Sequence, residues 1–292
     1  MSEERSPIKP QKRVISVQDI SCVGKCSLTV ALPILSACGI ETSILPTAVL
    51  STHTGGFTGY TFHDLTSEIE PIVAHWRMLG LRADALYTGY LGSDEQLALM
   101  GKFFDEFGGK GTIVMVDPAM ADAGKLYPAF DQKFALGMRD LVAKADLTCP
   151  NLTEASFMLE KEYPGDQAGD YDQAYIEQML RDLAALGPKQ VVLTGVTFEE
   201  GKVGAAAYDA QANSFDYYFT ERVEGYYHGT GDIYSSALLG AILNDKSLKE
   251  AIKVACDFTL GAIKRTQALG TDPKYGVDFE REIPALIKEL GL

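Results

Sequence analysis

The sequence predicts a single α/β domain in which helices cover both faces of a mostly parallel β-sheet. Short runs of β-branched or apolar residues alternate with longer helical patterns along the 292-residue chain, as is typical of repeated strand–helix–strand units. Late in the chain, two strand-like runs follow each other with no room for a helix, which predicts an antiparallel hairpin at one edge of the sheet. We therefore expect a ligand crevice beyond the carboxyl ends of the parallel strands.

The elements are expected in the following order. Strand-like runs for the parallel part of the sheet lie at residues 13–17, 41–46, 85–88, 112–116, 146–148 and 190–194. The edge hairpin would use residues 203–209 and 215–222. Helical spacing of apolar residues predicts helices at residues 28–37, 67–79, 95–107, 130–143, 153–159, 171–186, 233–243, 248–269 and 279–290.

The N-terminal residues 1–12 lack the apolar core of a secretory signal. We expect them to form a flexible tail, and we expect residues 13–292 to form one domain. The chain contains no run close to about eighteen uninterrupted apolar residues, so no membrane contact is expected. Its five cysteines show no paired metal spacing, and their odd number favours reduced thiols in the cytoplasm.

Composition and charge narrow the class of partner. Hydrophobic residues make up 46% of the chain and charged residues 23%, which is ordinary for a globular protein. The net charge of −14 disfavours nucleic acid, whose phosphates require a basic surface. At the binding site of an anionic substrate, this negative charge would have to be compensated. We expect a divalent cation held by acidic side chains to do so.

The stretch Gly229-Thr230-Gly231-Asp232 is the strongest functional signal. It opens an apolar helix, and the first amides of a helix have no intrahelical acceptors, so they form a ready anion site that glycines leave accessible. The carboxylate of Asp232 could take a proton from a substrate hydroxyl while these amides hold a phosphoryl group. The alternative is a tight turn with Asp232 as an ordinary helix N-cap.

Acidic and amide side chains follow two neighbouring strand candidates. Asp117 ends one strand and Asp122 follows a proline-fixed turn, while Asn151 and Glu154 begin the helix after the next strand. Oxygen ligands from two adjacent loops suit Mg²⁺, which takes one or two carboxylates together with nucleotide phosphates. The alternative is structural: Asp122 would cap a turn, and Asn151 with Glu154 would form a capping box.

Other polar side chains follow the remaining parallel strands and should meet over the same crevice. For His53 a structural hydrogen-bonding role is the alternative, and for Tyr90 simple packing. The candidates are Gln18, Asp19, Thr52, His53, Thr54, Tyr90 and Thr194. The chain has no G-x-x-x-x-G-K-[ST], no G-x-G-x-x-G after the first strand and no G-x-S-x-G, which disfavours P-loop enzymes, dinucleotide oxidoreductases and α/β-hydrolases.

Taken in order, these motifs resemble the ribokinase-like superfamily and, within it, the pyridoxal kinases, which are vitamin B6 kinases. Residues 229–232 are similar to the superfamily's G-x-G-D signature. Residues 117–122 resemble its D-P-V-[LM]-G-D segment, and residues 149–154 its T-P-N-x-x-E segment. Residues 51–55 and 89–93 resemble the S-N-H-T-G and G-Y-L-G-S segments of the B6 kinases. The likeness covers nearly the whole chain after the tail.

The resemblance implies a ribokinase-like three-layer fold and an ATP- and Mg²⁺-dependent kinase. Its substrate would be the 5′-hydroxymethyl group of pyridoxal, pyridoxamine or pyridoxine. The resemblance also implies a cytoplasmic homodimer. The implied roles are as follows: Asp232 is the catalytic base; Gly229, Thr230 and Gly231 form the anion hole; Asp122 and Glu154 organise Mg²⁺; Asn151 and Thr194 bind ATP phosphates; and Gln18, Asp19, Thr52, His53, Thr54 and Tyr90 contact the vitamer.

Two positions depart from the pattern of these kinases. They commonly have Q-S-H at the end of the first strand, whereas this chain has Gln18-Asp19-Ile20. The acid could bond a protonated ring nitrogen or the ammonium of pyridoxamine, or it could bond backbone amides of the following loop. Cys149 replaces the usual threonine, which removes one possible oxygen contact to the phosphates. The preferred vitamer is therefore open.

Two rival functions remain. One is a hydroxymethylpyrimidine kinase or other small-molecule kinase of the same superfamily; the former typically carry an S-G-G-A-G-I-Q-A-D run after the first strand, which this chain lacks. The other is a non-catalytic vitamer-binding protein. The presence of Asp232 and of the metal-loop acids counts against the second rival.

Overall fold

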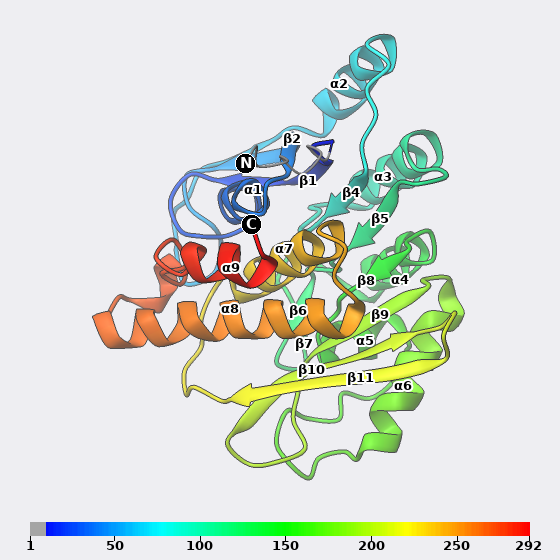
Figure 1. Ribbon diagram of the computed structural model, residues 1–292. Coiled ribbons are helices and arrows are strands. Elements are labelled where there is room, and N and C mark those ends of the chain that lie inside the picture. The colour runs from blue at the N-terminus through cyan, green and yellow to red at the C-terminus, as the bar shows by residue number, and fades with distance from the viewer. Residues whose placement is uncertain (1–9) are drawn as a thin grey trace, which may run out of the picture.

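The computed structural model describes residues 10–292, and a large β-sheet forms its centre (Figure 1). The strands of this sheet are β1 (Arg13–Ser21), β2 (Glu41–Leu50), β3 (Phe62–Asp64), β4 (Ala85–Thr88), β5 (Ile113–Val116), β8 (Leu147–Thr148), β9 (Gln190–Val196), β10 (Lys202–Asp209) and β11 (Ser214–Glu221). A separate short hairpin consists of β6 (Ala121–Asp122) and β7 (Lys125–Leu126).

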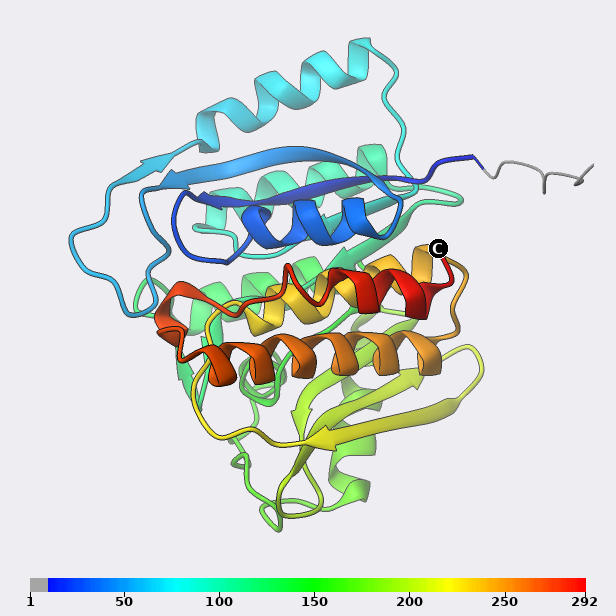
Figure 2. The same cartoon turned by 60° about the vertical axis from the view of Figure 1, so that its left-hand side comes forward.

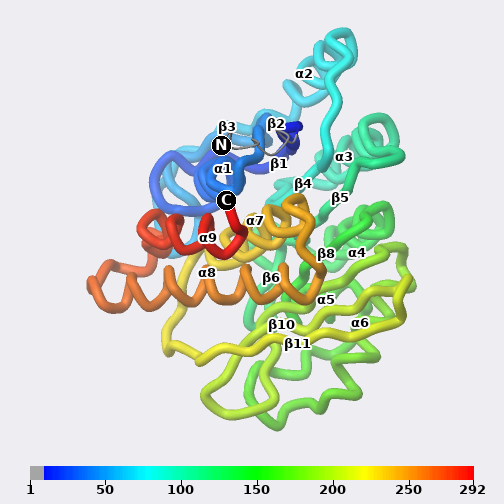
Figure 3. The backbone as a smooth tube through the Cα atoms, viewed as in Figure 1, coloured from blue at the N-terminus to red at the C-terminus, as the bar shows by residue number. Residues whose placement is uncertain are grey.

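The order of the strands, among the described residues, is β11-β10-β9-β8-β5-β4-β1-β2-β3. Parallel pairing runs from β2 through β1, β4, β5 and β8 to β9. At the β9 edge, β10 and β11 pair antiparallel, and the tube in Figure 3 shows them far from the blue strands β1 and β2. The predicted α/β fold, with a mostly parallel sheet and an antiparallel edge hairpin, is confirmed.

Helices cover both faces of the sheet (Figures 1 and 2). They are α1 (Leu28–Ala37), α2 (Thr66–Met78), α3 (Asp94–Phe107), α4 (Gln132–Val142), α5 (Leu152–Met158), α6 (Gln173–Leu186), α7 (Thr230–Leu243), α8 (Leu248–Leu269) and α9 (Ile283–Leu290), with a 3₁₀ turn at Pro273–Tyr275. The side chains of α1, α7, α8 and α9 form the core on one face, and those of α2 to α6 form the core on the other.

Successive strand residues alternate between these two cores, as the two-residue period of a strand requires. Val14 and Tyr87 pack under α1 and α7, whereas their neighbours Ile15 and Leu86 pack on the opposite face. Helix α7 contacts both α1 and α8, so it is buried on nearly all sides, and this explains why its sequence is apolar rather than amphipathic.

Several boundaries differ from the expectations. Strand β3 and the β6–β7 hairpin were not predicted, because three exposed residues and two-residue strands leave no periodic pattern. Helix α9 begins at Ile283 rather than at residue 279, and Pro284 lies in its first turn, where a residue without an N–H is tolerated. Phe279 is buried ahead of the helix. The expected tail falls mainly on residues 1–9, which lie outside the described residues; residues 10–12 are exposed and precede β1.

No helix in the described part of the chain has the length and apolar character needed to cross a bilayer.

Candidate active site

A pocket of about 1100 Å³ opens at the carboxyl ends of the parallel strands, where the sequence predicts the ligand crevice. It is bounded by the residues that follow β1, β4, β5 and β8, by the end of β9, and by the first turn of α7. The predicted site residues in its wall are Asp19, His53, Thr54, Tyr90, Asp122, Asn151, Glu154, Thr194, Gly229, Thr230, Gly231 and Asp232.

Gln18 and Thr52 are the two predicted site residues outside the wall of the pocket. Gln18 is fully buried, and its amide packs so closely under Gly89 that a methyl group on Gly89 would lie 2.9 Å from it. Neighbouring strand residues point to opposite sides, so Asp19 faces the pocket and Gln18 does not. The expectation that Gln18 and Thr52 contact a bound vitamer is not supported by their placement.

Asp232 lies in the first turn of α7, whose N-cap is Gly229 with φ 77°. The alternative interpretation of Asp232 as an ordinary N-cap is therefore wrong. Gly229 is required for close packing as well as for its backbone angle, because a methyl group there would lie 2.0 Å from the carbonyl oxygen of Lys25. Gly231 has open space around it and is exposed to the pocket.

The carboxylate of Asp232 accepts a hydrogen bond from the backbone N–H of Ser27 at 2.9 Å. Burial, together with the negative charges of Asp117 and Asp19, raises the pKa of Asp232 to about 7. A group with such a pKa is close to the optimum for a general base at neutral pH.

Two further acids lie deep in the pocket. The oxygens of Glu154 accept hydrogen bonds from the backbone N–H groups of Met120 and Asn151 at 3.1 and 2.8 Å, and the Asn151 side chain accepts one from Glu154 N–H. The capping-box alternative for Asn151 and Glu154 is therefore confirmed. Burial and the nearby charge of Asp117 raise the pKa of Glu154 well above its usual range, and burial also raises that of Asp117.

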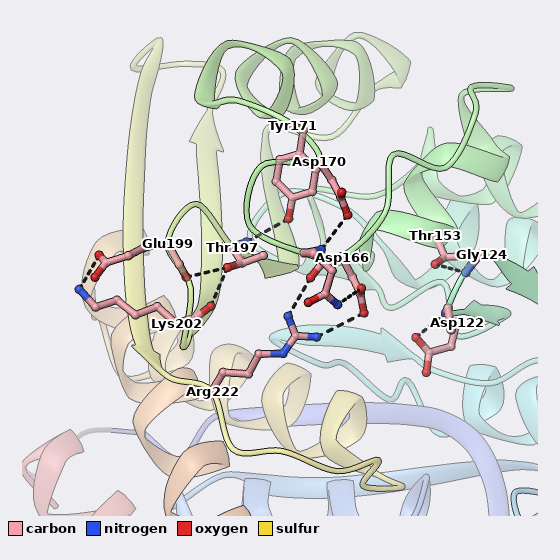
Figure 4. Close-up of polar contacts among 12 residues, drawn as sticks. Asp122, Gly124, Thr153, Asp166, Asp170, Tyr171, Thr197, Glu199, Lys202 and Arg222 are labelled. Atoms are coloured by element: carbon pink, nitrogen blue, oxygen red, sulfur yellow. Dashed lines mark hydrogen bonds and ion pairs between the residues drawn. The ribbon is translucent and has the colours of Figure 1, made fainter.

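Asp122 stands on the β6–β7 hairpin at the wall of the same pocket. One of its oxygens accepts a hydrogen bond from Ala123 N–H at 2.8 Å, and the next residue, Gly124, donates to Thr153 Oγ1 of α5 at 3.0 Å (Figure 4). Asn151 Nδ2 also donates to the carbonyl of Ala121 at 2.8 Å. The hairpin that carries Asp122 is thus fastened to the start of α5.

Within residues 10–292, no three His, Cys, Asp or Glu side chains are placed to coordinate one metal ion together. Mg²⁺ commonly keeps several waters and takes only one or two carboxylates, so Asp122 and Glu154, which both line the pocket, fit it better than they fit a closed transition-metal site. The charge of Asp117 raises the pKa of Glu154, so a cation nearby would favour the ionised form of both acids. Cys149 adds no charge, because burial raises the pKa of its thiol well above the usual range.

The outer wall near the ends of β9 and β11 is held by polar contacts shown in Figure 4. Arg222 donates to the carbonyl of Asp166 at 2.8 Å, and Thr197 N–H donates to the Tyr171 hydroxyl at 3.0 Å. Thr194 lies where β8 and β9 meet; its N–H donates to Pro150 carbonyl at 3.0 Å, beside Asn151. The contacts of Arg222 and Thr197 fix the loop before α6 against the segments next to the edge hairpin.

On the opposite wall, His53 uses both ring nitrogens. Nε2 lies 2.6 Å from the carbonyl of Lys274 and must donate, and Nδ1 accepts from Gly55 N–H at 3.1 Å. The structural alternative for His53 is therefore confirmed, and burial lowers its pKa. Only its ring face remains for a ligand. The Tyr90 ring lies 5.5 Å from that of Phe130, as the packing alternative expects, and Tyr90 still lines the pocket.

Asp19 is almost fully buried at the pocket wall. Its two oxygens accept hydrogen bonds from the hydroxyls of Ser27 and Ser21, at 2.6 and 2.9 Å. These partners are side-chain hydroxyls and not the loop amides that the sequence left open. Burial raises the pKa of Asp19.

Ser27, Tyr226 and His228 are among the wall residues that sequence reasoning missed. The rings of His228 and His53 lie 5.1 Å apart, and a methyl group on Gly55 would lie 2.4 Å from His228. Position alone could have indicated His228, since it directly precedes Gly229. Nothing in the local sequence indicates Ser27, because it is brought to Asp232 by tertiary packing.

Comparisons with known proteins identify the family of the chain. A model of the family "Phosphomethylpyrimidine kinase" matches residues 34–276. The chain is 28% identical over 267 residues to the pyridoxine/pyridoxal/pyridoxamine kinase of Bordetella avium (strain 197N), covering 87% of this chain and 85% of the relative.

Two solved structures are similar throughout. A candidate phosphomethylpyrimidine kinase from Bacteroides thetaiotaomicron VPI-5482, crystallised with pyridoxal, is 34% identical with a TM-score of 0.87, covering 97% of this chain and 96% of that one. The pyridoxal kinase of Lactobacillus plantarum is 30% identical with a TM-score of 0.85, covering 95% and 97%.

Proposed function

The chain belongs to the phosphomethylpyrimidine kinase family, and from that premise we propose that it phosphorylates the 5′-hydroxymethyl group of a B6 vitamer with ATP. One observation carries the proposal. A carboxylate with a pKa near 7 stands beside a glycine-lined helix N-terminus, in a pocket that also contains buried acids. A base, an anion site and a cation site are the parts that phosphoryl transfer to an alcohol requires.

In the proposed reaction, Asp232 takes the proton of the vitamer hydroxyl as the hydroxyl oxygen attacks the γ-phosphorus. The new O–P bond forms, the bond between the γ-phosphorus and the β–γ bridging oxygen breaks, and ADP leaves. The amides around Gly229, Thr230 and Gly231 would hold the oxygens of the transferring group, helped by the partial positive charge at the start of α7. Their fixed position removes reorganisation from the step.

The nucleotide would lie toward Asn151, Thr194 and the edge strands. Bound Mg²⁺ would neutralise phosphate charge there, and Asp122 and Glu154 would hold it, partly through water. Glu154 already accepts hydrogen bonds from two backbone N–H groups. We therefore assign it mainly to orienting the loop that carries Asp122, and its remaining lone pairs would be available to the cation.

The vitamer would lie toward His53, Thr54 and Tyr90, the side of the pocket built from the loops after β2 and β4. The Bacteroides relative was crystallised with pyridoxal, and the Bordetella relative carries all three vitamers in its name. These relatives favour a B6 vitamer over a hydroxymethylpyrimidine, although the family model is described by the latter type of kinase.

Two further proposals, on the oligomeric state of the enzyme and on its location in the cell, rest on the resemblance to B6 kinases. We propose a homodimer, which sedimentation would test. We also propose a cytoplasmic location, where ATP is the available phosphoryl donor and where the five free cysteines stay reduced. We assign it no nucleic-acid or membrane partner.

The test is ADP release with MgATP and a panel of alcohols: pyridoxal, pyridoxamine, pyridoxine and hydroxymethylpyrimidine. We expect turnover with at least one B6 vitamer and a lower kcat/KM with the pyrimidine. A preference for hydroxymethylpyrimidine would move the assignment to the rival kinase. Tight vitamer binding without turnover would instead support the non-catalytic alternative.

A further inference from the structure

Ser27, immediately before α1, has a backbone conformation that is rare outside glycine. Its φ is 55° and its ψ −132°. Residues other than glycine seldom adopt positive φ, and where they do, the surrounding structure holds them there, often at functional sites. Ser27 is nearly fully buried and lines the active-site pocket.

The hydroxyl of Ser27 does not cap helix α1, although Ser27 is at the N-cap position. A serine before a helix normally accepts a hydrogen bond from an N–H of the first turn, but Ser27 makes no such cap on α1. Instead its hydroxyl donates to Asp19 at 2.6 Å, while its backbone N–H donates to Asp232 at 2.9 Å. One residue thereby bridges two carboxylates, one on β1 and one on α7.

The loop that carries Ser27 is fixed on both sides. Ser27 forms an isolated antiparallel bridge with Ile20 of β1, and Lys25 N–H donates to the carbonyl of Tyr275 at 3.0 Å. The carbonyl of Lys25 lies directly over Gly229, where no side chain would fit. The loop therefore rests on the anion hole, and a shift of Ser27 would shift a partner of Asp232.

The second oxygen of Asp19 is occupied as well, by the hydroxyl of Ser21 at 2.9 Å. A carboxylate that is almost fully buried and holds two hydroxyls is well suited to anchor them, since hydrogen bonds to a charged acceptor are stronger than neutral ones. The aspartate at position 19, which departs from the pattern of the B6 kinases, is then explained by its hydrogen bonds to Ser27 and Ser21.

We propose that Asp19 and Ser27 form a tether that orients the carboxylate of Asp232 toward the substrate hydroxyl. Both are positioning residues, and Asp19 acts on Asp232 through Ser27 rather than by contacting the vitamer. The inference rests on the proposed role of Asp232 as the base.

The test is a double-mutant cycle of Ser27→Ala and Asp19→Ala, measured both on kinetics and on unfolding in urea. Because misplacing a catalytic group by about 1 Å can lower a rate about 10²-fold, we expect each single variant to lower kcat by about 10- to 100-fold. The KM of each vitamer should stay within about twofold and the ranking of vitamers should not change, as when an interaction specific to the transition state is lost.

Three comparisons make the cycle specific. The double variant should be no slower than the worse single variant, because either change breaks the same tether. Asp19→Asn should recover part of the kcat lost in Asp19→Ala, since its amide oxygen still accepts a hydroxyl. Ser21→Ala is the matched control: it removes a hydrogen bond to the same carboxylate but not the contact with Ser27, and should lower kcat less than Ser27→Ala.

Ser27→Gly replaces Ser27→Ala if that variant does not fold, because glycine adopts positive φ without strain and keeps the backbone N–H. The inference is overturned if the two changes are additive in kcat, or if Asp19→Ala alters vitamer KM and ranking while kcat is unchanged. If the parent protein is inactive on every vitamer, the proposed function is refuted. The coupling free energy between Asp19 and Ser27, measured by unfolding in urea, then tests the tether by itself, and the absence of coupling would refute the tether.

Discussion

Replacing Asp232 with asparagine should lower turnover by at least about 10²-fold and, at alkaline pH, make the protein more stable. Asparagine keeps the shape and can still accept the N–H of Ser27, but it cannot take a proton. Loss of a general base lowers a rate by about 10² to 10⁴. The gain in stability comes from the same feature, because an ionised Asp232 lies among Asp117, Asp19 and the protein interior.

The sign and size of that gain follow from proton linkage. The folded pKa is about 7, against an ordinary value of 3.8 for aspartate, so between these values the folded state holds more protons than the unfolded state and stability falls as pH rises. A shift of that size corresponds to at most about 4 kcal/mol at pH 8. Water in the open pocket screens the charge, so we expect about 1 to 2 kcal/mol, or about 2 to 3 °C in Tm for a chain of this length.

The assay pairs ADP release with thermal unfolding at pH 8 and pH 4, without Mg²⁺ or nucleotide. Asp232→Asn should raise Tm at pH 8 and leave it nearly unchanged at pH 4, where aspartate at this site is neutral. The exposed Asp140 on α4, mutated to Asn, is the control and should change neither activity nor Tm. Wild-type turnover in Asp232→Asn would refute the role as base, and a lower Tm at pH 8 would refute the electrostatic argument.

Other predictions concern the low-pH side of the pH–rate profile, the cation site and the anion hole. Because the base must be ionised, kcat/KM should fall as pH drops below about 7; a profile flat from pH 5 to 8 would count against Asp232 as base. Asp122→Ala should raise the Mg²⁺ needed for half-maximal activity with little change in Tm, whereas Glu154→Ala should also lower Tm by removing the capping box; unchanged Mg²⁺ dependence in both would leave them purely structural. Gly229→Ala should unfold at lower temperature because of its clash with Lys25, whereas Gly231→Ala, which has open space, should keep its Tm and lose activity; equal Tm values for these two variants would contradict the packing described here.

The sequence predicts the fold well where its patterns are long or its motifs are specific. The parallel strands and the apolar α7 are read directly from runs of buried residues, and the resemblance to B6 kinases is confirmed by relatives that share most of the chain. The elements that it missed, β3 and the β6–β7 hairpin, are too short to show a period. Their pairing is set by tertiary contacts instead.

For the site too, motifs predicted the main residues but not the contacts between distant segments. Motifs placed Asp232, Asp122 and Glu154 around one pocket, because each follows a strand or opens a helix at the same edge of the sheet. Motifs could not show that both ring nitrogens of His53 are already used, or that Ser27 bridges two carboxylates. The contacts of His53 with Lys274 and of Ser27 with Asp232 join segments distant in sequence, which no local pattern records.

The most direct test of the central claim is to identify the product formed from a B6 vitamer. The protein, MgATP and pyridoxal, pyridoxamine or pyridoxine would be incubated, and the phosphorylated product analysed by mass spectrometry and ³¹P NMR. We predict one phosphoryl group on the 5′-hydroxymethyl oxygen, formed in equal amount with ADP by the parent protein and at least about 10²-fold more slowly by Asp232→Asn. ADP formed without a phosphorylated vitamer, or vitamer phosphate formed equally by Asp232→Asn, would contradict this prediction.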